Sequence, residues 1–133
     1  MSSDSPPSDA PSGCSPPLAT LDAGALARLR ELDPDGRHGV LTRVLAAFET
    51  SLARMLVQLR AELDAGDPGV VAGVAHTLKS SSASVGALAL AASCAEVERR
   101  LRAGEPGDLP ADVRRLVDDG DAALRAVGAM LRP

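Results

Sequence analysis

Aromatic residues are almost absent from this sequence. Phe48 is the single aromatic side chain among 133 residues, and tryptophan and tyrosine do not occur. Alanine, leucine, valine and arginine dominate, which favours helices over strands, since strands are usually rich in aromatic and β-branched residues. Nucleic-acid-binding proteins typically combine stacking aromatics with a basic stripe, and the net charge of -4 argues against such a surface. The composition predicts an all-α protein without a nucleic-acid partner.

Long apolar runs and paired cysteines are also missing. No segment approaches the ~18 consecutive apolar residues of a membrane span. The start of the chain, MSSDSPPSDAPSGCSPP, has neither the basic first part nor the apolar centre of a signal peptide. Cys14 and Cys94 lie far apart and form no C-x-x-C pattern, which argues against a disulfide framework and a cysteine metal site. We expect a soluble cytoplasmic protein that does not bind a membrane.

The length of 133 residues suits one domain and is too short for two of ordinary size. Residues 1–17 contain only Ser, Pro, Asp, Gly, Ala, Met and Cys, and so cannot bury enough apolar surface to offset the entropy of ordering. We expect residues 1–17 to be a disordered tail and residues 18–133 to form the folded domain.

Glycine, proline and aspartate divide the predicted domain into helical segments. The predicted helices span residues 21–32, 37–64, 68–84, 87–103 and 110–131. Thr20 or Asp22 can cap the first helix, whereas Asp67 as N-cap and Pro68 at the first helical position mark the start of the third. Four long helices with short connections predict an antiparallel up-down four-helix bundle, preceded by a short extra N-terminal helix.

Three of the long helices carry apolar residues at intervals of three and four, the spacing of a seam that packs against its neighbours. The expected seam residues are Leu41, Leu45, Phe48, Leu52, Met55, Leu59 and Leu63 in the second helix, Leu90, Cys94, Val97 and Leu101 in the fourth, and Val113, Val117, Leu124, Val127 and Leu131 in the fifth. Gly120 occupies a seam position in the fifth helix. It either permits a close helix approach or marks a kink.

The segment AHTLKSSSASVGA, residues 75–87, places a lone histidine, His76, in a helix otherwise built for burial. At about 100° per residue, the side of this helix opposite His76 carries Val71, Val74, Leu78 and Val85. Within about 60° of His76 lie Ala72, Gly73, Lys79, Ser80 and Ala83. A core histidine would point with the valines and the leucine. The pattern therefore disfavours a core role and predicts that His76 stands on a low, accessible platform.

The same residues bear on two other roles of His76. His76 as a solvated surface histidine without a function stays possible, because exposed histidines are common. Metal binding is disfavoured, because bundle metal sites use Glu-x-x-His spacing and Gly73 stands three residues before His76. His38, the other histidine, has no ligand-like neighbours and is expected to be solvated or to cap a helix. We predict no metal and no cofactor in this chain.

Nucleophilic chemistry fits the surroundings of His76 better. Neutral imidazole is a good nucleophile near pH 7. Lys79, one turn away on the same face, can neutralise the oxygens of a phosphoryl group on the ring, and the small neighbours leave room for a second protein. The sequence contains no G-x-x-x-x-G-K-[ST] phosphate loop. These residues predict a carrier that accepts and donates a phosphoryl group, and not an enzyme that takes one from ATP.

The motif resembles that of histidine-containing phosphotransfer (HPt) domains of bacterial multistep phosphorelays. Their pattern A-H-x-L-K-G-[SA]-[SA]-x-x-x-G-A is similar to the run from Ala75 to Ser82 with Gly86 and Ala87, and the resemblance covers residues 21–131. In that family the histidine of a four-helix bundle accepts a phosphoryl group from a receiver aspartate and passes it to another receiver. The resemblance implies that His76 is the phosphoacceptor and that Lys79 helps to hold the phosphoryl group.

The resemblance also implies partners and further site residues. The expected partners are receiver domains and a hybrid histidine kinase, with Mg²⁺ bound by the receiver, and the chain is expected to act in trans as a monomer. The expected docking residues are Ala72, Gly73, Ser80 and Ala83; Ser80 takes the position where glycine is most usual. Some members orient the imidazole with a polar residue of the following helix. Glu98 is a candidate and Arg102 lies one turn beyond, although solvated charges are an equal alternative for both.

Three other residues near the motif have structural interpretations. Ser81 and Ser82 point toward the packed side of the helix and are expected to serve in packing, and Gly86 is expected to have a backbone role at the helix junction.

Rival functions remain at this point. A non-catalytic adaptor would bind a receiver or kinase and regulate it without being phosphorylated, but it would need neither His76 nor Lys79. An unrelated helical interaction module would match the motif by accident. A histidine kinase dimerisation hairpin usually has an acidic residue after its histidine, and here Thr77 follows.

Overall fold

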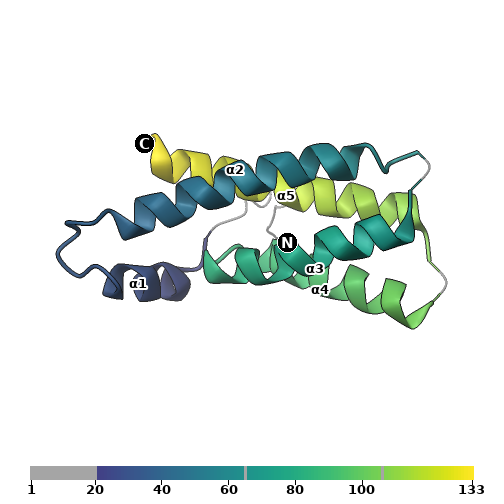
Figure 1. The fold of residues 1–133 in the computed structure, drawn as a ribbon, viewed down its shortest axis with the longest axis horizontal. Coiled ribbons are helices and arrows are strands. Elements are labelled where there is room, and N and C mark those ends of the chain that lie inside the picture. Colours follow the sequence, from purple (N-terminus) through teal and green to yellow (C-terminus); the bar gives the residue numbers. More distant parts are fainter. Residues whose placement is uncertain (1–20, 65, 106) are drawn as a thin grey trace, which may run out of the picture.

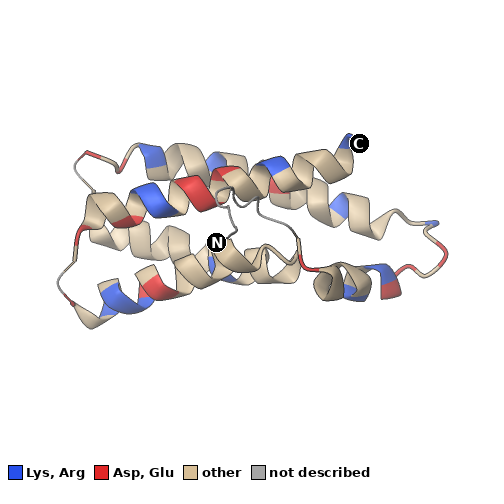
Figure 2. Ribbon diagram, turned by 180° about the vertical axis from the view of Figure 1, so that it is seen from behind, with Lys and Arg blue, Asp and Glu red and all other residues tan. Residues whose placement is uncertain are grey.

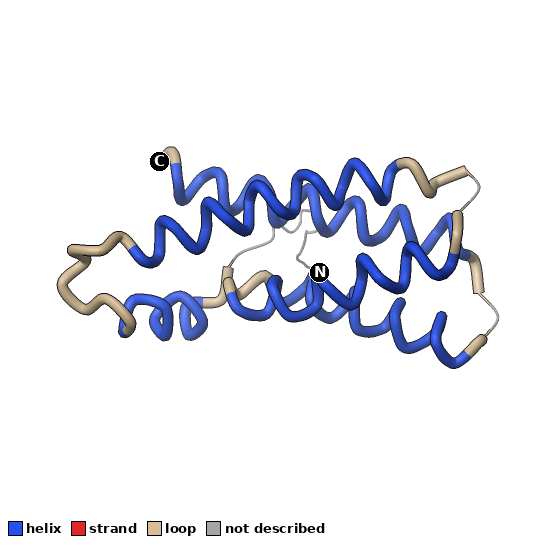
Figure 3. Tube along the Cα trace, viewed as in Figure 1, coloured by secondary structure: helices blue, strands red, loops and turns tan. Residues whose placement is uncertain are grey.

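The computed structural model describes residues 21–64, 66–105 and 107–133. Its helices are α1 (Ala23–Glu31), α2 (Val40–Arg60), α3 (Pro68–Ser84), α4 (Leu88–Ala103) and α5 (Leu109–Leu131) (Figure 1). Between them the described residues form loops and turns and no strand (Figure 3). This confirms the all-α prediction. The expected tail at residues 1–17 and the candidate cap Thr20 lie outside the described residues.

The four long helices run up and down and form a bundle, as predicted. α2 packs on α5 and α3 packs on α4, and the ring is closed by contacts between α4 and α5 and between α2 and α3. The short α1 packs against α2 at one end of the bundle, beyond the start of α4 (Figure 1). α3 therefore has α2 on one side and α4 on the other, and α5 lies diagonally across from it.

None of the helices in the described ranges is both long enough and apolar enough to cross a membrane.

The apolar core runs along the bundle axis and contains most of the predicted seam residues. The most deeply buried large side chains are Leu45, Leu52, Leu56, Leu59, Leu78, Leu90, Leu116, Val71, Val85, Val97, Val113 and Val127. Two of them, Leu56 and Leu116, were not predicted. Met55, which was predicted, is only partly buried, because α2 turns the next position, Leu56, toward α5. Leu41, Leu63, Leu101, Leu124 and Leu131 also lie at the edge of the core.

Gly120 marks a close approach of two helices. α5 continues through it without interruption from Leu109 to Leu131. A Cβ atom added at Gly120 would lie 2.5 Å from Cδ2 of Leu56, so the absent side chain leaves room for this leucine. α2 and α5 thus approach each other closely at a point where α5 has no side chain.

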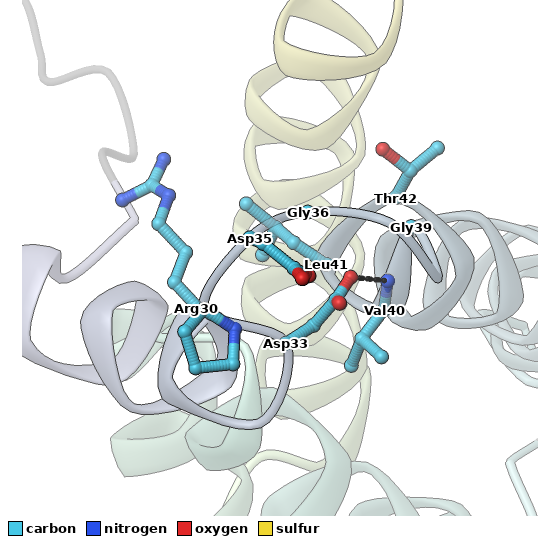
Figure 4. A pocket seen from close by; sticks show the side chains of 9 residues that line it. Arg30, Asp33, Asp35, Gly36, Gly39, Val40, Leu41 and Thr42 are labelled. Atoms are coloured by element: carbon cyan, nitrogen blue, oxygen red, sulfur yellow. Dashed lines mark hydrogen bonds between the residues drawn. The ribbon is translucent and has the colours of Figure 1, made fainter.

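Aspartate side chains cap most of the helices. Asp22, Asp67 and Asp108 accept hydrogen bonds from the backbone N–H groups of the first turns of α1, α3 and α5. α2 begins after Gly39 without such a cap; instead the buried Asp33 carboxylate, from the preceding loop, accepts from the N–H groups of His38 at 3.1 Å and Val40 at 3.2 Å. Figure 4 shows Asp33 beneath the α1–α2 loop, with its carboxylate directed at Val40.

Gly86 joins α3 to α4 and also holds the start of α1. Its φ of +82° is a conformation that side-chain-bearing residues rarely adopt. Its carbonyl accepts a hydrogen bond of 2.8 Å from the N–H of Asp22, and an added Cβ would lie 2.6 Å from that same nitrogen. The predicted backbone role of Gly86 is therefore confirmed.

Candidate functional site

His76 stands on the outer face of α3. About 63% of its side chain is exposed, whereas Val71, Val74 and Leu78 on the opposite side of the helix are buried. The helix rotation predicted from the sequence is therefore correct, and the ring is open to a partner.

The carboxylate of Glu98 on α4 is the centre of the polar contacts around His76. Only 8% of the Glu98 side chain is exposed, and its Oε2 lies 2.8 Å from Nδ1 of His76. Lys79 Nζ donates to the other oxygen, Oε1, at 2.8 Å, and Arg102 Nε donates to Oε2 at 2.8 Å. Glu98 is thus bound by three side chains from two helices.

These contacts lower the pKa of Glu98 to about 2. The hydrogen bond from Lys79 contributes most, those from Arg102 and His76 add to it, and burial acts in the opposite direction. Glu98 is consequently ionised at neutral pH and can only accept hydrogen bonds. Nδ1 of a neutral His76 must therefore carry the proton that it shares with Glu98, and the lone pair lies on Nε2.

The residues predicted to flank His76 divide into two groups. Gly73, Ser80 and Ala83 are exposed as expected, and a Cβ added at Gly73 would meet nothing within 4 Å. The prediction was wrong for Ala72, which is only 8% exposed and so is not part of the accessible surface around His76. It lies two turns before Lys79 on the same side of α3, and Lys79 contacts Glu98 of the closely packed α4.

The serines after the motif lysine have structural contacts. Ser81 Oγ donates to the carbonyl oxygens of Thr77 and Leu78, both at 3.3 Å. Ser82 is fully buried, and its hydroxyl has no hydrogen-bond partner within the part of the chain that is described. Both observations agree with the predicted packing role.

Other reactive side chains lie away from this site or are inert. No group of three or more His, Cys, Asp or Glu side chains that could hold a metal ion occurs in the described ranges. His38 is exposed in the loop before α2. Cys94 is buried in the core, and burial raises the pKa of its thiol to about 12, so it is protonated and unreactive at neutral pH.

The sequence alone did not decide whether Glu98 and Arg102 belong to the site, although the position of Glu98 in its helix gave one indication. Glu98 directly follows the seam residue Val97 and stands four residues after Cys94, so it borders the apolar seam of its helix. A charged residue at such a position needs a partner when it is buried. Arg102, four residues on, is one of the partners found.

A helical bundle with an exposed histidine on one helix, held by a carboxylate of the next, is the arrangement that the sequence motif predicted for a phosphoryl-carrying bundle. Comparisons with known proteins support this class. The family model described as Hpt domain matches residues 43–127, which is more than half of the chain, so the chain belongs to the Hpt domain family. The function of the chain is histidine phosphotransfer in a two-component phosphorelay. The family acts as a carrier and not as a kinase.

Among solved structures, the chain is similar to histidine-containing phosphotransfer protein B (HptB) from Pseudomonas aeruginosa. The two share 29% sequence identity with a TM-score of 0.71, and the match covers 89% of this chain and 97% of that chain. No curated protein sequence matched the chain.

Proposed function

We propose that Nε2 of His76 is the atom that accepts the phosphoryl group from the aspartate of a receiver domain and returns it to the aspartate of another. The observation that supports this most strongly is the hydrogen bond of 2.8 Å between His76 Nδ1 and the buried, ionised Glu98. It holds the ring, fixes the proton on Nδ1 and leaves the Nε2 lone pair free for attack.

The transfer step follows from this geometry. The Nε2 lone pair attacks the phosphorus of the receiver's acyl phosphate in line with the bond to the aspartate oxygen. The N–P bond forms as the P–O bond breaks, and the aspartate leaves as a carboxylate. His76 keeps its Nδ1 proton, so the phosphorylated ring is an imidazolium whose positive charge the Glu98 carboxylate offsets. Because no proton needs to be moved, the same step runs in reverse toward a second receiver.

Lys79 and Arg102 supply positive charge beside this reaction. Both side chains bind Glu98, and both are at least 40% exposed, so neither is locked in the interior. We assign Lys79 to the oxygens of the bound phosphoryl group, which it can reach from one turn along the same helix face. Glu98 and Arg102 are positioning residues. Any Mg²⁺ belongs to the receiver, where it offsets charge on the transferring group.

The partners that fit this role are receiver domains and a hybrid histidine kinase. Hpt domains act with such proteins, and the exposed Gly73, Ser80 and Ala83 beside His76 would let a receiver approach closely. We expect a monomer that acts in trans in the cytoplasm, and we expect no enzymatic activity of its own.

Transfer from a phosphorylated receiver tests the proposal. Receiver domains from the same organism are phosphorylated with a small-molecule donor and Mg²⁺, then mixed with the wild-type chain or with His76→Gln. We expect an acid-labile, base-stable phosphoprotein in the wild type and none in His76→Gln. If no receiver labels the wild type while receiver binding survives the substitution, the chain is a non-phosphorylated adaptor and the proposal is wrong.

A further inference from the structure

A hollow lies between α2 and α3, on the side of α3 away from Glu98. It has a volume of about 450 Å³. Its lining includes Arg54, Met55 and Gln58 from α2 and Val70, Gly73 and Thr77 from α3. Gly73 lies three residues before His76 and Thr77 directly after it, and both are exposed, so the hollow reaches the part of α3 that carries His76.

The floor of this hollow is apolar and its rim is polar. Met55 and Val70 are partly buried and pack on the core, whereas Arg54, Gln58 and Thr77 are exposed. The missing side chain of Gly73 leaves open space at the edge nearest His76. A protein surface can therefore enter here at the same time as it reaches the ring.

Arg54 is the charged group of this rim. Within the described part of the chain its side chain makes no hydrogen bond and no ion pair, whereas Arg60 on the same helix is bound to Asp121. An exposed guanidinium with no internal partner is free to bind a carboxylate of another molecule.

The charge around His76 differs in sign from that of the whole chain. Lys79 and Arg102 bind the Glu98 carboxylate on the α4 side of His76, and Arg54 adds a further positive charge on the α2 side, although the net charge of the chain is -4. Many acidic residues lie instead in the connections at both ends of the bundle (Figure 2). A receiver that holds Mg²⁺ beside its phosphoaspartate does so with oxygen ligands that include carboxylates, so we expect carboxylates near the docked surface.

We infer that Arg54 and the α2–α3 hollow form a receiver-docking contact, in which the guanidinium pairs with a carboxylate near the receiver's phosphoaspartate. This inference rests on the proposed function and adds a recognition residue on α2 to the site on α3 and α4. Arg54 attracts and orients the partner and does not touch the reacting atoms. Arg54 therefore acts on the rate at which the two proteins associate, and this effect weakens as salt screens the charges.

The test compares Arg54→Glu with the wild type in receiver-dependent phosphorylation at several salt concentrations. We expect kcat/KM for the phosphorylated receiver to fall about tenfold at low salt, and the salt dependence to become weaker or to reverse. Arg125→Glu is the matched control, because Arg125 is an exposed arginine on α5, diagonal to α3, and it should leave kcat/KM nearly unchanged.

A second readout separates docking from chemistry. A phosphoramidate can phosphorylate an accessible histidine without a receiver, and we expect Arg54→Glu to be labelled by it at the wild-type rate. An unchanged kcat/KM with the receiver would overturn the inference, and so would an equal loss of labelling by both donors, which would indicate a damaged site. Labelling of His76→Gln would instead overturn the proposed function, so the two failures are distinguishable.

Discussion

Glu98 accepts hydrogen bonds from His76, Lys79 and Arg102, and this arrangement gives one carboxylate two tasks. In the proposed transfer it fixes the ring and its proton before the step, and it offsets the charge of the imidazolium afterwards. Since the carboxylate is buried, it acts through a medium in which hydrogen bonds and charge pairs are stronger than in water. The reactivity of His76 should depend on it.

Replacing Glu98 with glutamine tests this dependence. The amide keeps the shape of the side chain and can still accept from Nδ1, but it has no charge to balance the imidazolium. We expect Glu98→Gln to slow phosphoryl transfer from a saturating receiver by about tenfold or more. Glu96→Gln is the control, because Glu96 is on the same helix but binds Arg99 and Arg100. Equal transfer rates in the wild type and Glu98→Gln would show that the carboxylate has no role in the reaction.

The lowered pKa of Glu98 also predicts how stability depends on pH. Its pKa is about 2 in the folded chain and near the ordinary 4.5 when unfolded. The stabilising effect is therefore complete above about pH 4.5 and is lost as the pH falls toward 2, because only the unfolded chain takes up the proton in this window. We expect urea unfolding between about pH 5 and pH 2.5 to show a shallower loss of stability for Glu98→Gln than for the wild type. Parallel curves would contradict the assigned pKa.

For individual residues, the sequence predicted correctly those positions that depend only on spacing along one helix. His76 and Lys79 share a helix face because they are three residues apart, and the motif identified both. Glu98 and Arg102 could only be candidates, since a contact between two helices depends on how each is rotated about its axis. The same dependence explains the error at Ala72: its direction was correct, but the closeness of α4 could not be read from one helix.

Among the elements, α3 was predicted with both of its ends, because its signals are local. Asp67 and Pro68 start the helix, and Gly86 follows its end. The start of α2 was placed three residues too early, because its N-cap is Gly39 and the carboxylate that accepts from the Val40 N–H belongs to Asp33, seven residues before it, so no helix-start pattern marks the boundary.

The contact between α2 and α5 at Gly120 gives a prediction at the same scale. A valine there would drive its side chain into Leu56, which is almost fully buried and has little space to move. We expect Gly120→Val to lower the free energy of unfolding by about 1–3 kcal/mol in urea titrations. Gly73→Val serves as control, because Gly73 is also within a helix but faces open space, and it should change stability by less than about 0.5 kcal/mol. Similar values for the two variants would refute the close approach.

For the molecule as a whole, composition and periodicity were enough to predict the bundle. Helix-favouring residues, seams at intervals of three and four and short connections leave few other ways to bury so many leucines and valines. Which helices pack most closely could not be predicted, since it depends on how the side chains fit. The structure pairs α3 with α4, and this pair supports the site, while the boundary of α3 with α2 is the more open one. His76 is thus fixed on one side and accessible on the other.

Transfer through Nε2 of His76 is tested most directly by locating the phosphoryl group on the receiver-phosphorylated chain by nuclear magnetic resonance of the histidine ring nitrogens. We expect one phosphorylated residue, His76, with phosphorus on Nε2 and a proton retained on Nδ1. Phosphorylation at Nδ1 of His76, or at any other side chain, would contradict it.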